Sequence, residues 1–383
     1  MRIAVVHSYY SSGAPSGENA IVDLSTQILR EAGHEVGLFD RRTDAQRDSL
    51  LYTFRSGMRV ATGLGASPSP VLREFAPDIV HVHNLFPNFG TRWLAEWRQR
   101  LITTIHNFRP VCANGLLFRD GVVCMACPNG SSIEAVKHSC YKDSRIATLP
   151  LAVRNLGGLP HDAIFSLSSR IITLSAAAKD MFERFGGSSE RMVVLPNGVP
   201  STQQVASGEG NGRWLTVGRL TVEKGISQLV GQWPATLELD IVGEGPLRDE
   251  ISAKLTPGTR LVGSLNRTEL LERMSQYEGL VFPSVCLEMQ PTVVIEAMSV
   301  GLPVVALKGN AGADLVVRFG AGEVYSGPED LERCLESARL SHEAFGAAGR
   351  HAYEQFYTPE RWLASIEGLY ADVAQSAERN GSS

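Results

Sequence analysis

The alternation of two kinds of segment constrains the fold of this chain more than any other feature. Short apolar runs that suit buried strands alternate with segments whose apolar residues recur at helical spacing. Strands that alternate with helices form parallel sheets, because parallel strands need a long crossover connection. The series occurs twice, on either side of a polar, Gly/Ser-rich stretch at 201–212, STQQVASGEGNG. We therefore predict an α/β protein with two Rossmann-like domains, whose parallel sheets face a central cleft.

The first half opens as a strand, a glycine-bearing loop and a helix. The strand is Arg2–His7, the loop contains Gly17, and the helix runs from about 19 to 32. The loop lacks Gly-x-Gly-x-x-Gly, which disfavours a dinucleotide cofactor. Two later strands end in His83 and His106, and the carboxyl ends of parallel strands border the ligand crevice. We expect His83 to be structural and treat His106 as a candidate to act on a substrate proton or hydroxyl.

The second half contains two glutamates eight positions apart in the stretch 282–301, FPSVCLEMQPTVVIEAMSVG. Glu288 lies on a loop after an apolar strand, and Glu296 lies about one turn into the following helix. The free N–H groups at that helix start form an anion site. An anionic leaving group and two carboxylates that grip sugar hydroxyls together indicate chemistry on a nucleotide sugar.

Two further loops in this half suit a diphosphate and a nucleoside. Arg219 and Lys224 lie five positions apart in a strand-to-helix loop. Arginine binds two phosphate oxygens through its planar fork and lysine adds a point charge, so together they neutralise a diphosphate without a metal. Gly243 and Gly245 form a tight loop that lets the backbone approach a base or ribose. The chain contains no Asp-x-Asp, so we expect no catalytic metal.

Four cysteines gather in an insertion at about 112–140. They are Cys112, Cys124, Cys127 and Cys140, with one Cys-x-x-Cys pair at the centre. In a chain with reduced thiols this density suits a structural metal better than disulfides. Three states stay open: a structural zinc ion, free or redox-active thiols, and an iron–sulfur cluster.

Composition and charge describe the setting of the chain. Its 383 residues suffice for two domains, and no apolar run approaches 18 residues. The N-terminus, MRIAVVHSYY, reads as a first strand and not as a signal peptide, which predicts a cytoplasmic protein. Residues 1–200 contain 21 Lys and Arg against 17 Asp and Glu, whereas the remainder contains 15 against 24. This asymmetry is compatible with an N-terminal half that faces a membrane or an anion.

The ordered motifs resemble the retaining glycosyltransferases of family 4, which have the GT-B fold. The second half contains GRLTVEKG, VGEGPL, VGSL, FPS and Glu-x7-Glu, and the first half contains GHEV, DIVHVHN, TIHN and LPNG. The resemblance covers nearly the whole chain. It implies a hexosyltransferase-like enzyme that moves a sugar from a nucleotide-diphosphate sugar to an acceptor, with retention of anomeric configuration.

The resemblance also implies how the second half binds the donor. Arg219 and Lys224 would hold the diphosphate, and Glu296 would bind the ribose hydroxyls. Glu288 would lie beside the transferred sugar and act in catalysis. The family often has glycine three positions after that glutamate, where this chain has Pro291, which has no N–H to donate. That contact would then come from the donor-binding residues Thr292 or Val293.

From the first half, the resemblance implies that Gly17 brings backbone close to the phosphate and sugar of the donor. His106 would touch the sugar at the reacting centre. The loop reads Ser16-Gly17-Glu18 where Gly-Gly is common in the family. Two other functions stay open: a nucleotide-sugar epimerase of the same fold, and a protein that binds a nucleotide sugar without turnover.

We expect an acceptor-side domain at 1–200, a donor-binding domain at 201–358, and a C-terminal helix at 359–383 that packs back on the first domain. The expected acceptor is a saccharide or lipid-linked polysaccharide precursor, reached by peripheral contact at the inner face of the membrane. No nucleic-acid partner is expected. Arginines interleave with apolar residues in one early stretch: Arg41, Arg42, Arg47, Arg55 and Arg59 with Leu50, Leu51, Phe54 and Met58. Trp93 and Trp97, among further arginines, also suit a headgroup interface.

Overall fold

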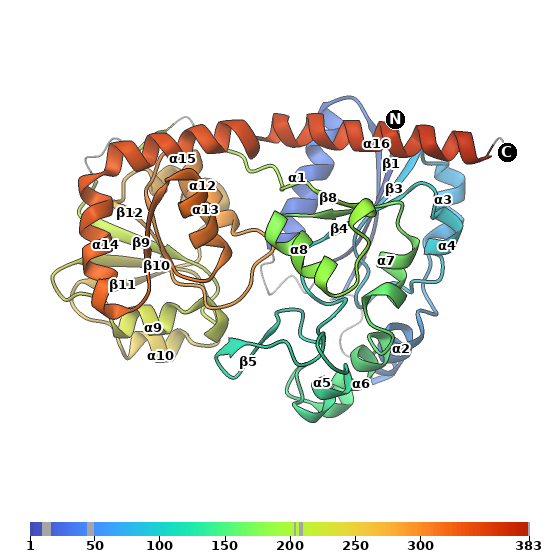
Figure 1. The fold of residues 1–383 in the computed structure, drawn as a ribbon, viewed down its shortest axis with the longest axis horizontal. Coiled ribbons are helices and arrows are strands. Elements are labelled where there is room, and N and C mark those ends of the chain that lie inside the picture. The colour runs from blue at the N-terminus through green and yellow to red at the C-terminus, as the bar shows by residue number, and fades with distance from the viewer. Residues whose placement is uncertain (10–16, 44–49, 203, 207–209, 382–383) are drawn as a thin grey trace. The chain divides into compact units, whose positions relative to one another are not determined.

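The computed structural model describes residues 1–9, 17–43, 50–202, 204–206 and 210–381, which form two compact units (Figure 1). Unit 1 comprises Met1–Leu117, Cys124–Asn197 and Trp362–Ser383. Unit 2 comprises Phe118–Val123 and Gly198–Arg361. Each unit contains a six-stranded sheet with parallel pairing throughout. The predicted fold class, two Rossmann-like α/β domains with parallel sheets, is therefore confirmed.

The sheet of unit 1 has the strand order β2-β1-β3-β4-β7-β8. Its central strands are almost wholly buried because helices cover both faces, as parallel sheets require. The strands are β1 (Arg2–Tyr9), β2 (Glu35–Arg42), β3 (Ile79–Asn84), β4 (Leu101–Ile105), β7 (Arg170–Thr173) and β8 (Met192–Val194).

The helices of unit 1 differ widely in length. They are α1 (Gly17–Glu31), α2 (Leu50–Thr62), α3 (Ser69–Phe75), α4 (Leu94–Trp97), α5 (Ile133–Lys137), α6 (Arg145–Arg154), α7 (Ala163–Leu167) and α8 (Ala176–Arg184). Short 3₁₀ turns lie at Leu159–His161 and Ser189–Arg191, and the hairpin β5–β6 (Phe118–Arg119 and Val122–Val123) interrupts the cysteine-containing insertion.

The C-terminal helix α16 (Pro359–Gly381) belongs to unit 1 from Trp362 onward. The Tyr370 hydroxyl is buried and lies 2.7 Å from Nδ1 of His81 on β3. Glu367 lies 2.8 Å from Nε2 of His34, which precedes β2. Helix α16 is therefore bound to the first sheet.

The sheet of unit 2 has the order β11-β10-β9-β12-β13-β14. Its strands are β9 (Arg213–Val217), β10 (Glu238–Val242), β11 (Thr259–Gly263), β12 (Gly279–Phe282), β13 (Val304–Leu307) and β14 (Gly322–Tyr325). Its helices are α9 (Ile226–Gly231), α10 (Arg248–Ser252), α11 (Arg267–Met274), α12 (Thr292–Ser299), α13 (Ala311–Phe319), α14 (Pro328–Leu340) and α15 (His342–Phe356), with a 3₁₀ turn at Val222–Lys224.

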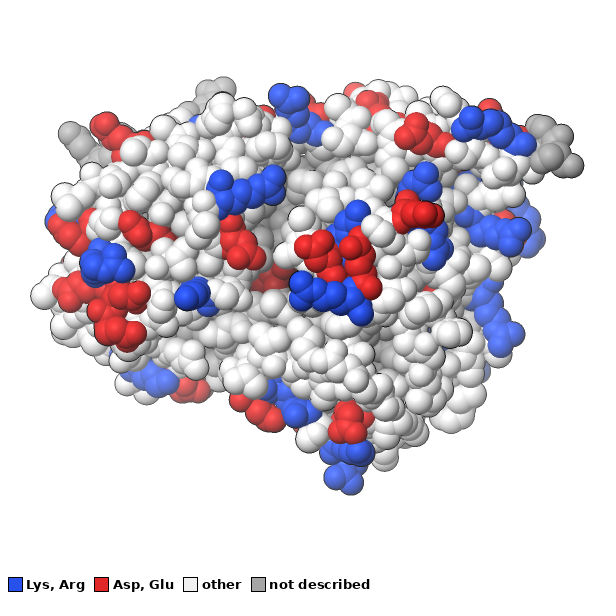
Figure 2. All heavy atoms as spheres, viewed as in Figure 1, with Lys and Arg blue, Asp and Glu red and all other residues white. Residues whose placement is uncertain are grey.

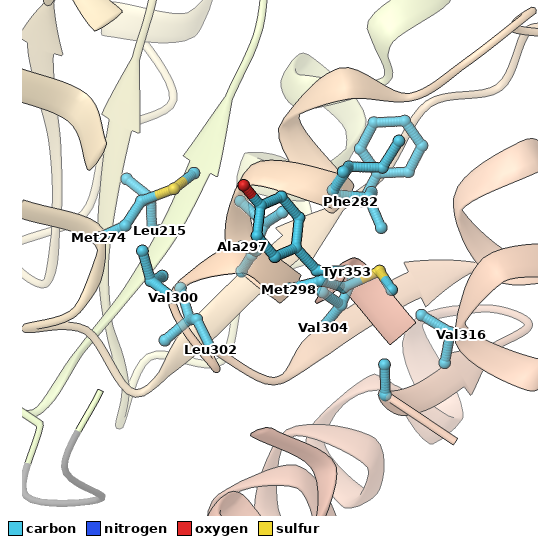
Figure 3. Packing of buried hydrophobic residues seen from close by; sticks show 14 of the residues in the cluster. Leu215, Met274, Phe282, Ala297, Met298, Val300, Leu302, Val304, Val316 and Tyr353 are labelled. Carbon is cyan, nitrogen blue, oxygen red and sulfur yellow. The ribbon is translucent and has the colours of Figure 1, made fainter. Parts of the chain in front are cut away.

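Alternation along the strands of unit 2 builds a separate core on each face. Leu280 and Phe282 join the core under α11, α12, α13 and α15, whereas Val281 between them joins the core under α9, α10 and α14. Figure 3 shows part of the first core, where Phe282 lies near Met298 of α12. Because α12 is packed against β12, the two glutamates at its start and on the preceding loop are held on a rigid frame.

None of the helices in the described ranges is both long and apolar enough to cross a membrane. Figure 2 shows acidic and basic side chains intermixed over the face drawn there.

Candidate functional site

Four histidines lie together at the carboxyl edge of the unit 1 sheet. His7 is on β1, His81 and His83 are on β3, and His106 directly follows β4. His83 Nδ1 lies 2.9 Å from His106 Nε2, and their rings stack with centroids 5.2 Å apart. His83 also stacks on His81 at 4.3 Å. His106, the candidate from the sequence, is thus the outermost member of a packed row.

Burial keeps this row neutral. It lowers the pKa of His81 and of His106 to about 3, and nearby His7 and His81 further disfavour a charge on His106. The pKa of His83 is held well below its usual value by burial and by the neighbouring rings. A neutral His106 cannot serve as an acid near pH 7, but it can donate or accept a hydrogen bond.

His83 has a more specific role than the structural one expected from the sequence. One of the two nitrogens in the His83–His106 bond must donate and the other accept, so His83 selects the tautomer of His106. His81 is fixed in turn by Thr104 at 2.8 Å and Tyr370 at 2.7 Å. In the sequence, the spacing His-x-His indicates the contact of His81 with His83, because side chains two apart on a strand point to the same face.

Gly17 begins α1, and the structure brings it toward His106. Glu18, next to Gly17, accepts a hydrogen bond of 3.3 Å from Asn107, next to His106. A Cβ at Gly17 would meet no atom within 4 Å in the described structure. None of the described residues fills the space beside this glycine, and the assignment of Gly17 to the donor stays a prediction.

A charged pair lies at the carboxyl edge of the unit 2 sheet. Lys224 Nζ lies 2.6 Å from Glu288 Oε1, and the Ser284 hydroxyl donates to the same oxygen at 2.7 Å. Burial opposes the charge of Lys224, but the Glu288 carboxylate outweighs it and raises the pKa of Lys224. Both side chains are largely buried, so Lys224 is a fixed cation within reach of a ligand beside Glu288.

Arg219 lies on the same loop but is more accessible. Its side chain is 59% exposed, and its guanidinium lies 3.3 Å from Glu223. An arginine this exposed is free to move onto a phosphate. The structure therefore brings Arg219, Lys224 and Glu288 to one edge of unit 2.

Gly225, Gly243 and Gly245 shape this edge by close packing. Gly225 has φ +68°, and a Cβ there would clash with the carbonyl of Pro283. Added Cβ atoms at Gly243 and Gly245 would clash with the backbone of Gly218 and Leu220, which flank Arg219. The two glycines of the VGEGPL motif thus support the Arg219 loop, and their contact with a base or ribose stays a prediction.

Glu296 lies one turn into α12 and is buried. Burial raises its pKa, and Arg267 opposes this from 3.0 Å. Sequence analysis missed Arg267, which begins α11 directly after the capping residue Asn266. Pro291 precedes the helix, so the first N–H groups of α12 come from Thr292 and Val293, as the departure from the family pattern implied.

None of the four cysteines of the insertion forms a disulfide bond in the described structure. Burial and the neighbouring Cys112, Cys140 and Cys124 raise the pKa of Cys127 to about 11. Across the described ranges, the structure contains no group of three or more His, Cys, Asp or Glu side chains arranged to hold a metal ion. A structural zinc at Cys112, Cys124, Cys127 and Cys140 stays a prediction that this geometry does not support.

Comparisons with known proteins agree with both units. A family model described as Glycosyltransferase Family 4 matches residues 17–203, and one described as Glycosyl transferases group 1 matches residues 211–338. The glycogen synthase of Mycobacterium tuberculosis is 24% identical over 402 residues, covering 92% of this chain and 88% of that protein.

Two solved structures share the fold over 97% of this chain. Sucrose-phosphate synthase from Thermosynechococcus elongatus has a TM-score of 0.70, 17% identity and 98% coverage of its own chain. Anabaena HepE, solved in complex with UDP-glucose, has a TM-score of 0.62, 14% identity and 100% coverage. Two parallel-sheet units of this kind define the GT-B class. The chain belongs to the family 4 glycosyltransferases.

We expect the neutral histidines to make stability depend on pH between about 6.5 and 3. In the unfolded chain a histidine binds a proton near pH 6.5, whereas His81 and His106 in the folded unit do so only near pH 3. The unfolded state therefore binds more protons in this window, and the free energy of unfolding decreases as the pH falls.

Urea unfolding at pH 7 and pH 5 measures this effect. Replacing buried His83 with glutamine should reduce the pH dependence by about 1 to 2 kcal/mol. His351→Gln, at an exposed position of unit 2, is the matched control and should leave it unchanged. Equal pH dependence in the parent and His83→Gln would show that His83 does not contribute.

Proposed function

We propose that this glycosyltransferase moves a hexose from a nucleotide-diphosphate sugar to a saccharide or lipid-linked acceptor, with retention of anomeric configuration. The observation that carries the proposal is the largely buried Lys224–Glu288 pair, 2.6 Å apart, beside the exposed Arg219. The solved complex of HepE with UDP-glucose supports a donor of this class. Retention rests on the family resemblance alone.

In this proposal unit 2 binds the donor. Arg219 and Lys224 neutralise the diphosphate and stabilise the charge that develops as it leaves. The first N–H groups of α12, on Thr292 and Val293, add partial positive charge. Glu296 accepts hydrogen bonds from the ribose, and its ion pair with Arg267 partly offsets the burial that raises the pKa of its carboxyl.

Glu288 and His106 act at the transferred sugar. Lys224 and Ser284 hold one Glu288 oxygen, so the carboxylate is fixed in orientation and suited to stabilise positive charge on the sugar ring. His106 is neutral, so its part is to hold a sugar hydroxyl through a hydrogen bond in the tautomer that His83 selects. No catalytic metal is needed, because the diphosphate charge is met by side chains.

Replacing either cation of the donor loop should slow transfer. We expect Lys224→Gln and Arg219→Gln each to lower kcat/KM for the donor about a hundredfold, because each removes a charge-assisted contact at a developing charge. The measurement is nucleotide release from a panel of nucleotide sugars with saccharide acceptors. In Lys224→Gln the glutamine amide can donate a hydrogen bond to Glu288, so the variant removes the positive charge while a polar side chain stays in place.

Arg333→Gln is the matched control, since this arginine is 67% exposed on α14. Parent-like donor kinetics in both donor-loop variants would contradict the phosphate assignment. An isomerised sugar nucleotide formed from donor alone would identify an epimerase instead, and donor binding without product would identify a binding protein.

The acceptor is proposed to lie at a membrane, with unit 1 docking on the inner face. Helices α2 and α6 pack together where Gly57 meets Pro150, and both expose large apolar side chains beside this contact. These are Phe54 and Met58 on α2, and Ile146, Leu149 and Val153 on α6. Arg55 and Arg145 are exposed on the same helices. Apolar side chains with basic neighbours suit an anionic bilayer surface.

The structure corrects one part of the sequence argument for docking. Trp93 is buried, and its indole donates to the Gly90 carbonyl, while Trp97 is half-buried and donates to Ser69. These tryptophans pack within unit 1 and do not form a headgroup interface. Arg47 and the side chains of Leu50 and Leu51 lie outside the described residues.

Docking predicts cosedimentation with anionic vesicles at low salt and release at high salt, because each basic residue near the surface contributes about 1 kcal/mol. The double variant Phe54→Ser, Ile146→Ser should lose at least about tenfold in vesicle affinity, since it removes two exposed apolar side chains. Leu340→Ser, 77% exposed on α14, is the control. Equal and negligible binding to anionic and neutral vesicles would rule out this docking.

A further inference from the structure

The four residues after β3 and Leu85 form a loop, Phe86–Phe89, that gathers basic and phenolic side chains from distant parts of unit 1. Each of these four loop residues contacts a different basic or phenolic side chain. The Arg109 guanidinium lies over the Phe86 ring at 4.3 Å, and Arg59 Nη1 donates to the Pro87 carbonyl at 3.0 Å. The Tyr52 hydroxyl donates to Asn88 at 2.7 Å, and the Arg41 guanidinium lies over the Phe89 ring at 5.6 Å.

This gathering of charge lacks a carboxylate partner. Within the described ranges no Asp or Glu forms an ion pair with Arg41, Arg59 or Arg109, although arginines nearby in sequence, such as Arg42, are paired. Burial and the charge of Arg41 lower the pKa of Arg59, so the two guanidiniums repel each other. Arg41 is exposed, but Arg59 and Arg109 are partly buried, so their charges are costly unless an anion is bound beside them.

Two buried donors in the cluster also lack an acceptor. Nε of Arg59 and Nε of Arg109 are buried, and neither has a hydrogen-bond partner in the described structure. The terminal nitrogens are only partly used, by the carbonyls of Pro87 and Ala113. Buried donors without partners cost free energy, and a ligand oxygen would satisfy them.

The cysteine-containing insertion supports one wall of this loop. Phe86 packs in a small core with Ala113, Ala135 and Leu151, against which Cys127, Cys140 and Tyr141 are also packed. The Arg109 guanidinium lies 5.8 Å from the centroid of the Tyr141 ring, and the Lys142 ammonium lies 5.6 Å from it. The segment directly after the insertion thus places an aromatic face beside Arg109.

We propose that the cluster of Arg41, Arg59 and Arg109 around Phe86–Phe89 binds a phosphate group of the acceptor. A phosphoryl dianion is favoured over a neutral saccharide because it neutralises two neighbouring guanidiniums, and guanidinium forks match its oxygens. Tyr52 and Tyr141 offer hydroxyl and ring contacts beside it, which suit an attached sugar. This inference rests on the proposed function, since it specifies the acceptor of that reaction.

The direct test uses sn-glycerol 3-phosphate as a soluble probe and isothermal titration calorimetry of the full chain. Arg59→Gln and Arg41→Gln should each weaken binding at least about tenfold, because each removes a charge-assisted contact. Arg55→Gln, the same charge change one turn away on an exposed face of α2, should leave the affinity unchanged. Circular dichroism confirms that each variant is folded.

A second arm separates this site from the donor site. Arg219→Gln should leave glycerol phosphate binding unchanged if the cluster is the site. Binding lost in Arg219→Gln but kept in Arg59→Gln would overturn the inference while leaving the proposed donor site intact. Equal losses in Arg55→Gln and Arg59→Gln, or no saturable binding at millimolar probe, would also overturn it.

A third arm distinguishes a soluble phosphate source from a lipid one. Vesicles of phosphatidylcholine with phosphatidic acid compete with glycerol phosphate if the cluster accepts a lipid-linked phosphate, and phosphatidylcholine alone is the blank. Competition that Arg59→Gln abolishes and Arg184→Gln, at an exposed position of α8, preserves assigns a lipid-linked acceptor to the cluster. Glycerol phosphate binding without competition assigns a soluble phosphorylated acceptor, and both outcomes support the phosphate site.

Discussion

Parallel strand pairing is the constraint on which the rest of this structure depends. In a parallel sheet all strands end at the same edge, so residues that follow different strands meet there. In unit 1 this rule gathers His7, His83 and His106, from β1, β3 and β4. In unit 2 it gathers the loops that carry Lys224 and Glu288, from β9 and β12. Helices on both faces bury the sheets and make these edges rigid.

The two edges differ in their electrostatics. In unit 1, His81, His83 and His106 pack in a row with Tyr370 against His81, and burial keeps these three neutral. In unit 2 the largely buried Lys224 faces the largely buried Glu288, and each charge compensates the desolvation of the other. A neutral hydrogen-bonding edge suits sugar hydroxyls, whereas a charged edge suits a diphosphate that gains charge as it leaves.

The insertion at 112–140 has a packing role that its cysteines alone did not indicate. Its side chains pack against Phe86, and Tyr141, which directly follows it, lies under the Arg109 guanidinium. A basic and aromatic cluster lies there in the half of the chain proposed to bind the acceptor. The exposed apolar side chains of α2 and α6 lie on the same helix pair that contributes Tyr52 and Arg59. Helix α2 therefore presents one face to the proposed phosphate site and another to the proposed membrane.

The sequence by itself determined the two parallel-sheet units, because the alternation of apolar runs and helical spacing is local and leaves few topologies. It also placed Arg219, Lys224, Glu288 and His106 at strand ends, because motif order and strand boundaries are readable along the chain. Contacts between residues that are far apart in the sequence could not be predicted from the sequence. The Arg267–Glu296 pair, the His83–His106 bond and the four contacts of Phe86–Phe89 each join residues that only folding brings together. Burial likewise depends on tertiary packing, which is why only the structure showed that the histidines are neutral and that Trp93 is enclosed within unit 1.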